Sequence, residues 1–238
     1  MRLITTSLLC LLFSLTCQAA DPRFTVIPVD TTTEELQLYL RDDKDRGFKQ
    51  FDRLKTWLAG QGKELRFAMN AGMYHADYSP VGLYVQQGQQ LTPLNLGDAY
   101  GNFFLKPNGV FLLTQSGPMV VESSEYPPLA AKTILATQSG PLLLRKGVIH
   151  PAFKENSTSR LKRNGVGVVG NKALFVITEQ PVNLYEMAQF FRDELHCQDA
   201  LYLDGNISGI YSTELNRNDA TVDLGPIIAV VQATTDAK

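Results

Sequence analysis

The chain has 238 residues, of which 44% are hydrophobic and 19% charged, so it is long and apolar enough to bury one sizeable core as a single domain. Its 22 basic and 24 acidic residues nearly balance, and no run of Lys or Arg exceeds two residues. Nucleic-acid binding normally leaves a basic stripe, so no nucleic-acid partner is expected.

The first twenty residues have the order of a secretory signal peptide. Arg2 precedes an apolar run from Leu3 to Leu15, and small and polar residues follow as far as Ala20. About thirteen residues are too few for a bilayer span, which needs about twenty, so a retained anchor is the weaker alternative. We expect residues 1–19 to be a cleaved signal, residues 20–238 to form the mature domain, the location to be periplasmic or secreted, and no stable membrane insertion after cleavage.

Cysteine usage agrees with that location. Cys10 and Cys17 lie in the expected signal, so Cys197 alone remains and no intramolecular disulfide can form. An exported domain held by its core alone is more typical of a bacterial periplasm than of small eukaryotic secreted proteins. Cys197 follows a helical pattern, which predicts a half-buried apolar residue and not a nucleophile.

The remaining sequence is dominated by short apolar segments that predict strands. Alternating residues indicate two strands at 24–29 and 36–40, and one helical face follows at 48–58, stopped by Gly60 and Gly62. Further strands are predicted at 65–69, 81–86, 91–96, 109–114, 119–122, 133–137, 141–145, 166–169, 173–178, 200–203 and 227–232.

One strong helix interrupts this series. Asn183 and Glu186 form a capping box, and Met187, Phe191 and Leu195 follow at helical spacing. Many strands with two helices and no regular alternation predict an α+β single domain, with a large mixed or mostly antiparallel sheet core and a few packed helices.

Several familiar motifs are excluded by their context. The string from Gly165 to Gly170 matches a dinucleotide fingerprint, but a strand follows it where a helix is required. The three histidines lack metal-ligand spacing, and no Gly-x-Ser-x-Gly elbow occurs. We therefore expect no metal and no cofactor.

Four polar segments at strand ends contain more amides, hydroxyls and glycines than folding requires. Each alone is an ordinary turn, but together they have the composition from which polar-ligand sites are built. They are Asn70-Ala71-Gly72-Met73-Tyr74, Asn108-Gly109, Gln138-Ser139-Gly140-Pro141 and Asp204-Gly205-Asn206-Ile207-Ser208-Gly209.

With Arg163-Asn164-Gly165-Val166-Gly167, these segments occur in the order seen in the phosphodiester glycosidase family, which the chain resembles over residues 65–232. That family includes the catalytic domain of the mammalian uncovering enzyme, which removes N-acetylglucosamine from phosphomannose. Two positions depart from the family pattern: Asn206 replaces a second glycine, and Asn164-Gly165 replaces a Thr-Ala pair. The resemblance is therefore to a bacterial subgroup.

The resemblance implies hydrolysis of a sugar phosphodiester, with a small-molecule or glycan substrate in the cell envelope. Cleavage at the anomeric carbon requires a carboxylate, for which Asp204 is the first candidate and Glu179 the second. Arg163 is expected to bind the phosphate through its planar fork. The remaining expected binding residues are Asn70, Gly72, Asn108, Ser139, Gly140, Gly205 and Ser208.

From these roles we expect Asn70, Arg163 and Asp204 to converge in one cavity. Two alternatives stay open: a non-catalytic envelope protein that binds a sugar phosphate or polysaccharide, and a factor in exopolysaccharide assembly.

Overall fold

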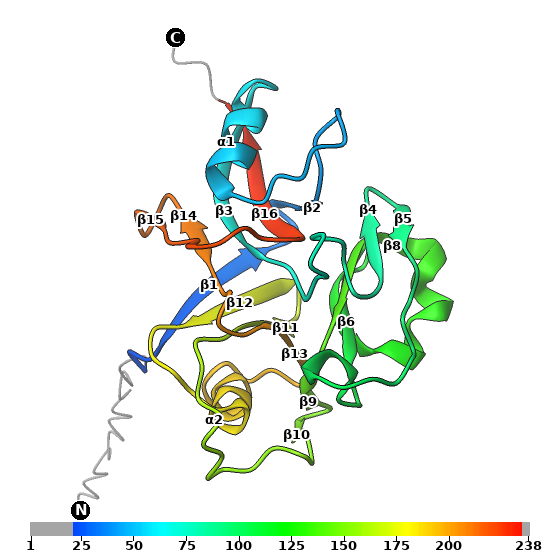
Figure 1. Cartoon of the computed structure of the whole chain (residues 1–238), viewed down its shortest axis with the longest axis vertical. Coiled ribbons are helices and arrows are strands. Elements are labelled where there is room, and N and C mark those ends of the chain that lie inside the picture. Colours follow the sequence, from blue (N-terminus) through cyan, green and yellow to red (C-terminus); the bar gives the residue numbers. More distant parts are fainter. Residues whose placement is uncertain (1–20, 235–238) are drawn as a thin grey trace, which may run out of the picture.

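The structure is a computed structural model and describes residues 21–234. The expected signal peptide therefore lies outside the described residues. Within them, the strands form three antiparallel sheets around a shared interior (Figure 1).

The first sheet has six strands. Its order across the sheet is β1 (Phe24–Asp30), β12 (Lys172–Thr178), β11 (Asn164–Val169), β13 (Ala200–Asp204), β9 (Leu142–Arg145) and β10 (Val148–Ile149). The second and third sheets have five strands each. Their orders are β15 (Arg217–Asn218), β14 (Ile210–Ser212), β3 (Lys63–Asn70), β16 (Ile227–Ala233) and β2 (Glu35–Tyr39), and β5 (Gln89–Thr92), β4 (Tyr84–Gln86), β8 (Thr133–Ser139), β6 (Gly109–Thr114) and β7 (Gly117–Glu122).

Two helices cover the outer faces of these sheets. Helix α1 (Phe51–Ala59) buries Phe51, Leu54 and Leu58 against the second sheet. Helix α2 (Leu184–Gln189) continues into a π-helical turn, Phe190–Glu194, and packs Met187 and Phe191 against the first sheet. The 3₁₀ turns η1 (Asn102–Phe104), η2 (Ser123–Glu125) and η3 (Pro127–Lys132) complete the elements.

The core joins all three sheets. Phe175 of β12 lies with its ring centroid 5.3 Å from that of Phe67 in β3 and 5.8 Å from that of Phe111 in β6. These three side chains belong to one cluster of buried residues. The antiparallel α+β class is confirmed, and the strands divide among three sheets that share this cluster.

The glycine-rich string 165–170 lies in a β-hairpin, as its sequence context indicated. Strand β11 runs into β12 through Gly170, whose φ is 57°. A Cβ on Gly165 would lie 2.7 Å from the Leu201 carbonyl oxygen, and one on Gly167 would lie 2.6 Å from Cys197 Sγ. Close packing of neighbouring elements therefore accounts for both glycines.

The boundaries of several expected elements differ. The helix expected from residue 48 begins at Phe51, and the strand expected at 91–96 ends at Thr92. Strands β14 and β15 were not predicted because they are short and polar at their ends. The capping box at Asn183 is confirmed, since Asn183 Oδ1 accepts the Glu186 N–H and Glu186 Oε2 accepts the Asn183 N–H, both at 2.9 Å.

Candidate active site

Asp204 is the last residue of β13 and its carboxylate has uncharged hydrogen-bond partners. Its Oδ1 accepts the Gly205 N–H at 2.7 Å, and its Oδ2 accepts Asn70 Nδ2 at 3.3 Å. Burial raises the pKa of Asp204 to about 6, although these two hydrogen bonds act in the opposite direction. The carboxylate is thus set to change its protonation state close to neutral pH.

Asn70 is held so that its amide nitrogen faces Asp204. Its Oδ1 accepts both Asn164 Nδ2, at 2.9 Å, and the Gly209 N–H, at 3.1 Å. An amide oxygen that receives two donors fixes the flip of the side chain, so Nδ2 is left to donate to the carboxylate. Asn70 and Asn164 are both completely buried.

The register of the sheets brings these residues together. Asn164, the first residue of β11, pairs with Asp204 at the end of β13. Asn70 ends β3 in the second sheet, and Asn164 Nδ2 also donates to its carbonyl oxygen at 3.0 Å. The site is therefore built where the first and second sheets meet, from residues up to 134 positions apart.

The hydroxyl group of Ser208 closes the loop after β13. Ser208 Oγ lies 2.6 Å from the Gly205 carbonyl oxygen and 3.2 Å from Asn164 Oδ1. A hydroxyl group has one proton and donates to one acceptor at a time, so the hydrogen bond to Asn164 Oδ1 is an alternative to the shorter one. Gly205 and Ser208 thus belong to the Asp204 network, and their contact with substrate stays a prediction.

Gly72 and Ser139 pack next to the segments that carry Asn70 and Asp204. Gly72 has a φ of 128°, and a Cβ there would lie 3.1 Å from Thr137 Oγ1. Ser139 Oγ donates to the carbonyl oxygen of Leu203 at 2.9 Å, directly before the candidate carboxylate. Both residues fix strand β8 against the segments that carry Asn70 and Asp204.

Asn108 and Gly140 lie against a different segment. Asn108 Nδ2 donates to the Phe103 carbonyl oxygen at 2.7 Å, and a Cβ on Gly140 would lie 2.7 Å from the same oxygen. The structure therefore places both residues beside the η1 turn, and neither hydrogen-bonds the Asp204 carboxylate.

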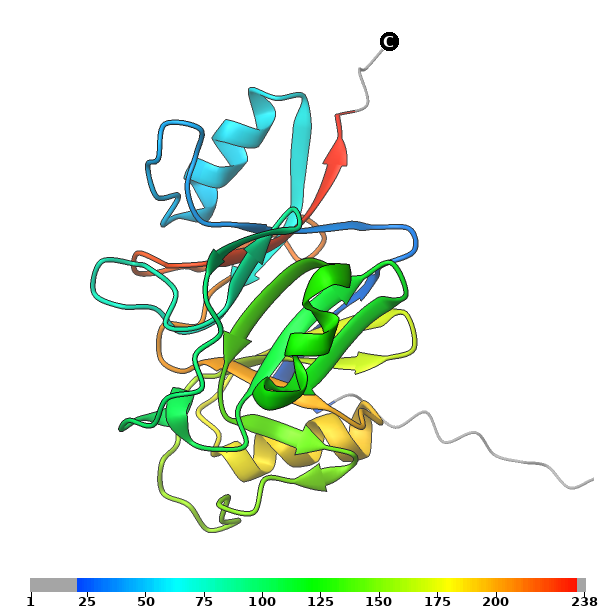
Figure 2. The ribbon, with the colours of Figure 1, turned by 90° about the vertical axis from the view of Figure 1, so that its right-hand side faces the viewer.

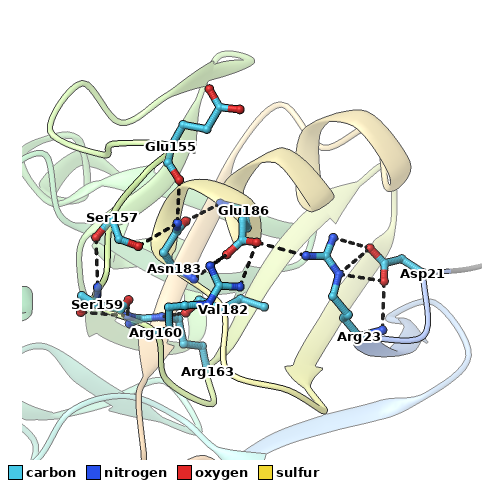
Figure 3. Close-up of polar contacts among 10 residues, drawn as sticks. All are labelled: Asp21, Arg23, Glu155, Ser157, Ser159, Arg160, Arg163, Val182, Asn183 and Glu186. Carbon is cyan, nitrogen blue, oxygen red and sulfur yellow. Dashed lines mark hydrogen bonds and ion pairs between the residues drawn. The ribbon is translucent and has the colours of Figure 1, made fainter.

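Arg163 is buried, with only 1% of its surface exposed. Its Nε donates to the Val182 carbonyl oxygen and its Nη2 to the Ser159 carbonyl oxygen, both at 2.9 Å (Figure 3). Its Nη1 donates to the Tyr202 hydroxyl at 3.0 Å. Asn70 and Asp204 are thus in contact, whereas Arg163 contacts Tyr202, and the shared cavity expected for all three stays a prediction. The contact of Arg163 with phosphate also stays a prediction.

Glu179 has a different environment from Asp204. It pairs with Arg217 at 2.6 Å and accepts the Thr25 hydroxyl, while Arg217 also pairs with Asp219 at 2.6 Å. The two carboxylate oxygens of Glu179 are thus already engaged by a guanidinium and a hydroxyl group. The geometry favours Asp204 over Glu179 for the chemical step.

Three residues near the carboxylate were not selected from the sequence. Asn164 lies in the motif 163–167, but the sequence analysis assigned a binding role only to its neighbour Arg163. Tyr202 and Tyr74 lie close enough for the Asp204 charge to act on them, and burial, the larger cause, raises the pKa of each to about 12. The Tyr74 hydroxyl donates to the Asp223 carbonyl oxygen at 2.8 Å, and the Tyr202 hydroxyl accepts Arg163 Nη1 at 3.0 Å, so their hydrogen-bond partners lie outside the Asp204 carboxylate.

Across residues 21–234, no group of three or more His, Cys, Asp or Glu side chains could hold a metal ion. In the same range, no helix is both long and apolar enough to cross a membrane.

Comparison with known proteins gives a consistent result. Residues 63–228 match the family described as phosphodiester glycosidase. An uncharacterized Escherichia coli protein, YigE, is 36% identical over 199 residues, which cover 82% of this chain and 77% of that protein.

Two solved structures share the fold. The catalytic domain of zebrafish N-acetylglucosamine-1-phosphodiester alpha-N-acetylglucosaminidase, auto-inhibited by its pro-peptide, aligns with a TM-score of 0.58 at 12% identity, covering 89% of this chain and 84% of that one. A hypothetical protein from Synechocystis aligns with a TM-score of 0.56 at 15% identity, covering 87% and 59%. At these identities the likeness concerns the fold.

Proposed function

Because the chain belongs to the phosphodiester glycosidase family, we propose that it hydrolyses the bond between a sugar and the phosphate of a sugar phosphodiester. The observation that carries this proposal is the Asp204 carboxylate, which is held by the neutral amides of Asn70 and Gly205 and has a pKa raised to about 6. Perturbed carboxylates of this kind are concentrated at catalytic sites.

The chemistry requires negative charge near the anomeric carbon. Glycosidic cleavage passes through an oxocarbenium-like state, which an ionised carboxylate stabilises as nucleophile or as general base. The leaving group is a phosphomonoester, which needs little protonation, so one carboxylate suffices. Asp204 would take this role, and Glu179, neutralised by Arg217, would not.

The neutral surroundings of Asp204 suit an anionic substrate. A second ionised carboxylate beside the phosphate would repel it, whereas amide N–H groups stabilise an anion without needing a counter-charge. The completely buried Asn70 supplies one such group to the Asp204 carboxylate itself. Arg163 would add positive potential from behind Tyr202, since its guanidinium is buried without a carboxylate among its hydrogen-bond acceptors.

The proposed place of action is the cell envelope. The sequence of residues 1–19 has the order of a signal peptide, with Arg2 before an apolar run that ends in small and polar residues. We therefore propose that the mature protein acts in the periplasm or outside the cell.

The test is release of sugar from a panel of sugar-1-phosphodiesters by purified mature protein, with products read by mass spectrometry. Wild-type protein is expected to release a free sugar and a phosphomonoester. The Asp204→Asn variant should remain folded and lose at least about 100-fold in turnover, on the order of 3 kcal/mol of transition-state stabilisation. Binding of the diesters without cleavage would instead support a non-catalytic sugar-phosphate-binding protein.

A further inference from the structure

Strand β1 is the outermost strand of the first sheet, so one of its two edges is open. It pairs with β12 alone, in unbroken register. At one end of this pairing the Glu179 N–H donates to the Arg23 carbonyl oxygen at 2.8 Å, and at the other the Thr31 N–H donates to the Asn171 carbonyl oxygen at 3.1 Å. Backbone groups alternate between the two edges of an antiparallel strand. The odd-numbered residues of β1 therefore bond β12, and the even-numbered ones direct their backbone groups to the open edge.

Part of this open edge has no hydrogen-bond partner. The Phe24 N–H donates within the preceding turn, and the Asp30 N–H donates to Glu34 Oε2 at 2.7 Å. Pro28 has no N–H to donate. In the described part of the chain, no hydrogen bond involves the N–H or carbonyl oxygen of Val26 or the carbonyl oxygens of Phe24 and Pro28. An edge with such free groups can accept one more strand.

A groove lies along this edge, between the first and second sheets. Its volume is about 520 Å³, within the usual range of ligand sites. It is lined by the consecutive β1 residues 26–29, by residues 212–215 at the end of β14 and by residues 230–232 of β16. The buried Phe67 of β3 is a further lining residue, so the groove reaches the shared core cluster.

The third sheet leaves this groove uncovered. In Figure 1, β14 and β15 lie above β1, on the side of the molecule away from the third sheet. Figure 2, which views the molecule from the side of the third sheet, shows β1 in deep blue behind the green strands. None of the lining residues belongs to the third sheet, and Asp204 is not among them. The groove is therefore a feature separate from the candidate active site.

The rim of the groove is acidic. Three glutamates line it, Glu34, Glu35 and Glu214, together with one arginine, Arg66. Arg66 is already paired with Glu64 at 3.3 Å. Glu34 and Glu214 are exposed, and within the described residues neither forms an ion pair with Lys or Arg. The groove therefore has excess negative charge, which favours a partner with positive charge.

We propose that the groove along β1 binds an extended, basic peptide segment of another protein, which adds to the first sheet as a strand. The peptide residue opposite Val26 exchanges two backbone hydrogen bonds with it, and the residues opposite Phe24 and Pro28 donate their N–H groups to the free carbonyl oxygens. Alternate side chains of the peptide pack into the groove, and basic ones pair with Glu34 and Glu214.

The same features disfavour a second copy of this chain on the edge. Two β1 edges related by a two-fold axis through Val26 would place Phe24 opposite Pro28, where neither has a free N–H, so the ladder would contain only two hydrogen bonds. The two acidic rims would also bring Glu34 and Glu214 of both copies together, and like charges repel. A basic peptide supplies both the N–H groups and the charge that a second copy lacks.

The binding test is a fluorescence anisotropy titration of the purified mature protein with labelled acetyl-Lys-Val-Lys-Val-Lys-Val-amide. The peptide with Glu in place of Lys is the control for charge and should not bind. Val26→Pro removes the outward N–H without removing a hydrogen bond to β12, a position where a strand tolerates proline. It is expected to weaken binding of the basic peptide by roughly fivefold or more, and Pro28→Val, which adds an outward N–H, should not weaken it.

A charge variant tests the acidic rim. Glu214→Gln should weaken binding of the basic peptide by roughly twofold to fivefold and reduce its salt dependence. Glu155→Gln is the matched control, because Glu155 is exposed and does not line the groove. Thermal unfolding checks that each variant is folded. Equal effects of the two Gln variants, or unchanged binding by folded Val26→Pro, would show adsorption by charge alone and overturn strand addition.

Amide exchange tests the pairing without any substitution. With saturating basic peptide, the Val26 N–H should exchange with solvent at least about tenfold more slowly, whereas the Ile27 N–H, which faces β12 in both states, should change little. Unchanged exchange of Val26 would reject the proposal. Light scattering of the free protein covers the alternative occupant: a wild-type dimer that Val26→Pro converts to a monomer would assign the edge to a second copy and overturn the peptide site.

Discussion

At the residue scale, Asp204 and Glu179 show how surroundings separate two carboxylates of one chain. Glu179 is paired with Arg217, whereas Asp204 accepts hydrogen bonds from Asn70 and Gly205 in a half-buried position. Desolvation disfavours the ionised form of Asp204, and its pKa is raised to about 6. Its protonation therefore changes near pH 6, close to neutrality.

This pKa predicts the pH dependence of catalysis. If ionised Asp204 acts as nucleophile or base, kcat/KM should rise with pH and level off above about 6, because the phosphodiester keeps one charge throughout. The measurement is a kcat/KM profile with a fixed diester substrate between about pH 4 and about pH 8. A profile that falls through pH 6 would assign Asp204 the role of a protonated acid.

The same pKa predicts that Asp204 lowers stability at neutral pH. A carboxyl whose folded pKa exceeds its unfolded value binds its proton more tightly when folded, so the free energy of unfolding decreases as pH rises from about 4 to about 6. Asp204→Asn replaces the carboxylate by an uncharged amide of the same shape. Because the buried charge is removed, the free energy of unfolding should rise by up to about 3 kcal/mol at pH 8, with little gain at pH 4.

Urea unfolding at the two pH values measures this difference directly. Because the amide nitrogen of the new side chain would face one donor, part of the gain is lost to that contact. A variant that is less stable than wild type at the higher pH would show that the ionised carboxylate is well solvated in the folded protein.

Individual site residues were predictable from the sequence to the extent that their chemistry could be seen there. Asp204, Asn70 and Ser208 were found because polar residues at strand ends stand out from apolar strands. Asn164 was missed because its task is to orient Asn70, and that task depends on a contact between two sheets. The direction of the Arg163 guanidinium was equally hidden, since no sequence pattern shows which carbonyl groups surround it.

At the element scale, Arg163 connects β11 to the segments on both sides of it. Its guanidinium donates to the carbonyl oxygens of Val182, just before α2, and Ser159, in the preceding loop. Its third partner is the Tyr202 hydroxyl in β13. The guanidinium donates from three separate nitrogen atoms to these three acceptors, whereas the donors of a lysine ammonium group all lie on one nitrogen atom.

Arg163→Lys is therefore expected to lower the free energy of unfolding by about 1–3 kcal/mol, because at least one buried acceptor loses its donor. Arg160→Lys is the control, since Arg160 is exposed and its ion pair with Glu186 is of a kind worth little. Both variants are compared by thermal and urea unfolding. Equal stability of the two would show that water replaces the lost contacts of Arg163.

The phosphate role of Arg163 needs a separate measurement. In Arg163→Lys, kcat/KM for a sugar phosphodiester should fall more than that for an uncharged aryl glycoside of the same sugar, because the guanidinium supplies potential and hydrogen bonding that a lysine reproduces only in part. A decrease by the same factor for both substrates would assign Arg163 to the architecture of β11 and β13 alone.

The elements themselves follow the sequence closely where periodicity is strong. The long strands and the capped helix at Asn183 were predictable, since apolar alternation and a capping box are local signals. The helix ends in a π-helical turn at Phe190–Glu194, which packing against the first sheet imposes and no local signal announces. The irregular stretch 93–101 was partly assigned to a strand because Leu94 and Leu96 alternate there.

At the scale of the whole molecule, the pairing of strands into three sheets was beyond the sequence. Neighbours such as β3 and β16 or β9 and β13 are far apart in the chain, and such pairings are fixed by which faces must be buried together. The site depends on this assembly, because Asn70 belongs to one sheet and Asp204 to another.

Phe175 provides the test of whether the three sheets fold as one unit. Its ring contacts Phe67 in the second sheet and Phe111 in the third, and all three side chains are buried in the same cluster. Phe175→Ala is expected to lower the free energy of unfolding by about 3–5 kcal/mol, because it leaves a cavity at the junction of the sheets.

If the core is cooperative, this variant should still unfold in one transition, with coincident curves from circular dichroism and tyrosine fluorescence. Val169→Ala is the control, since that side chain is exposed in the same sheet. Two separated transitions in the variant would show that the sheets are independent units. Asn70 and Asp204 would then be held together by their own hydrogen bonds, and loss of activity on heating should precede unfolding of either sheet.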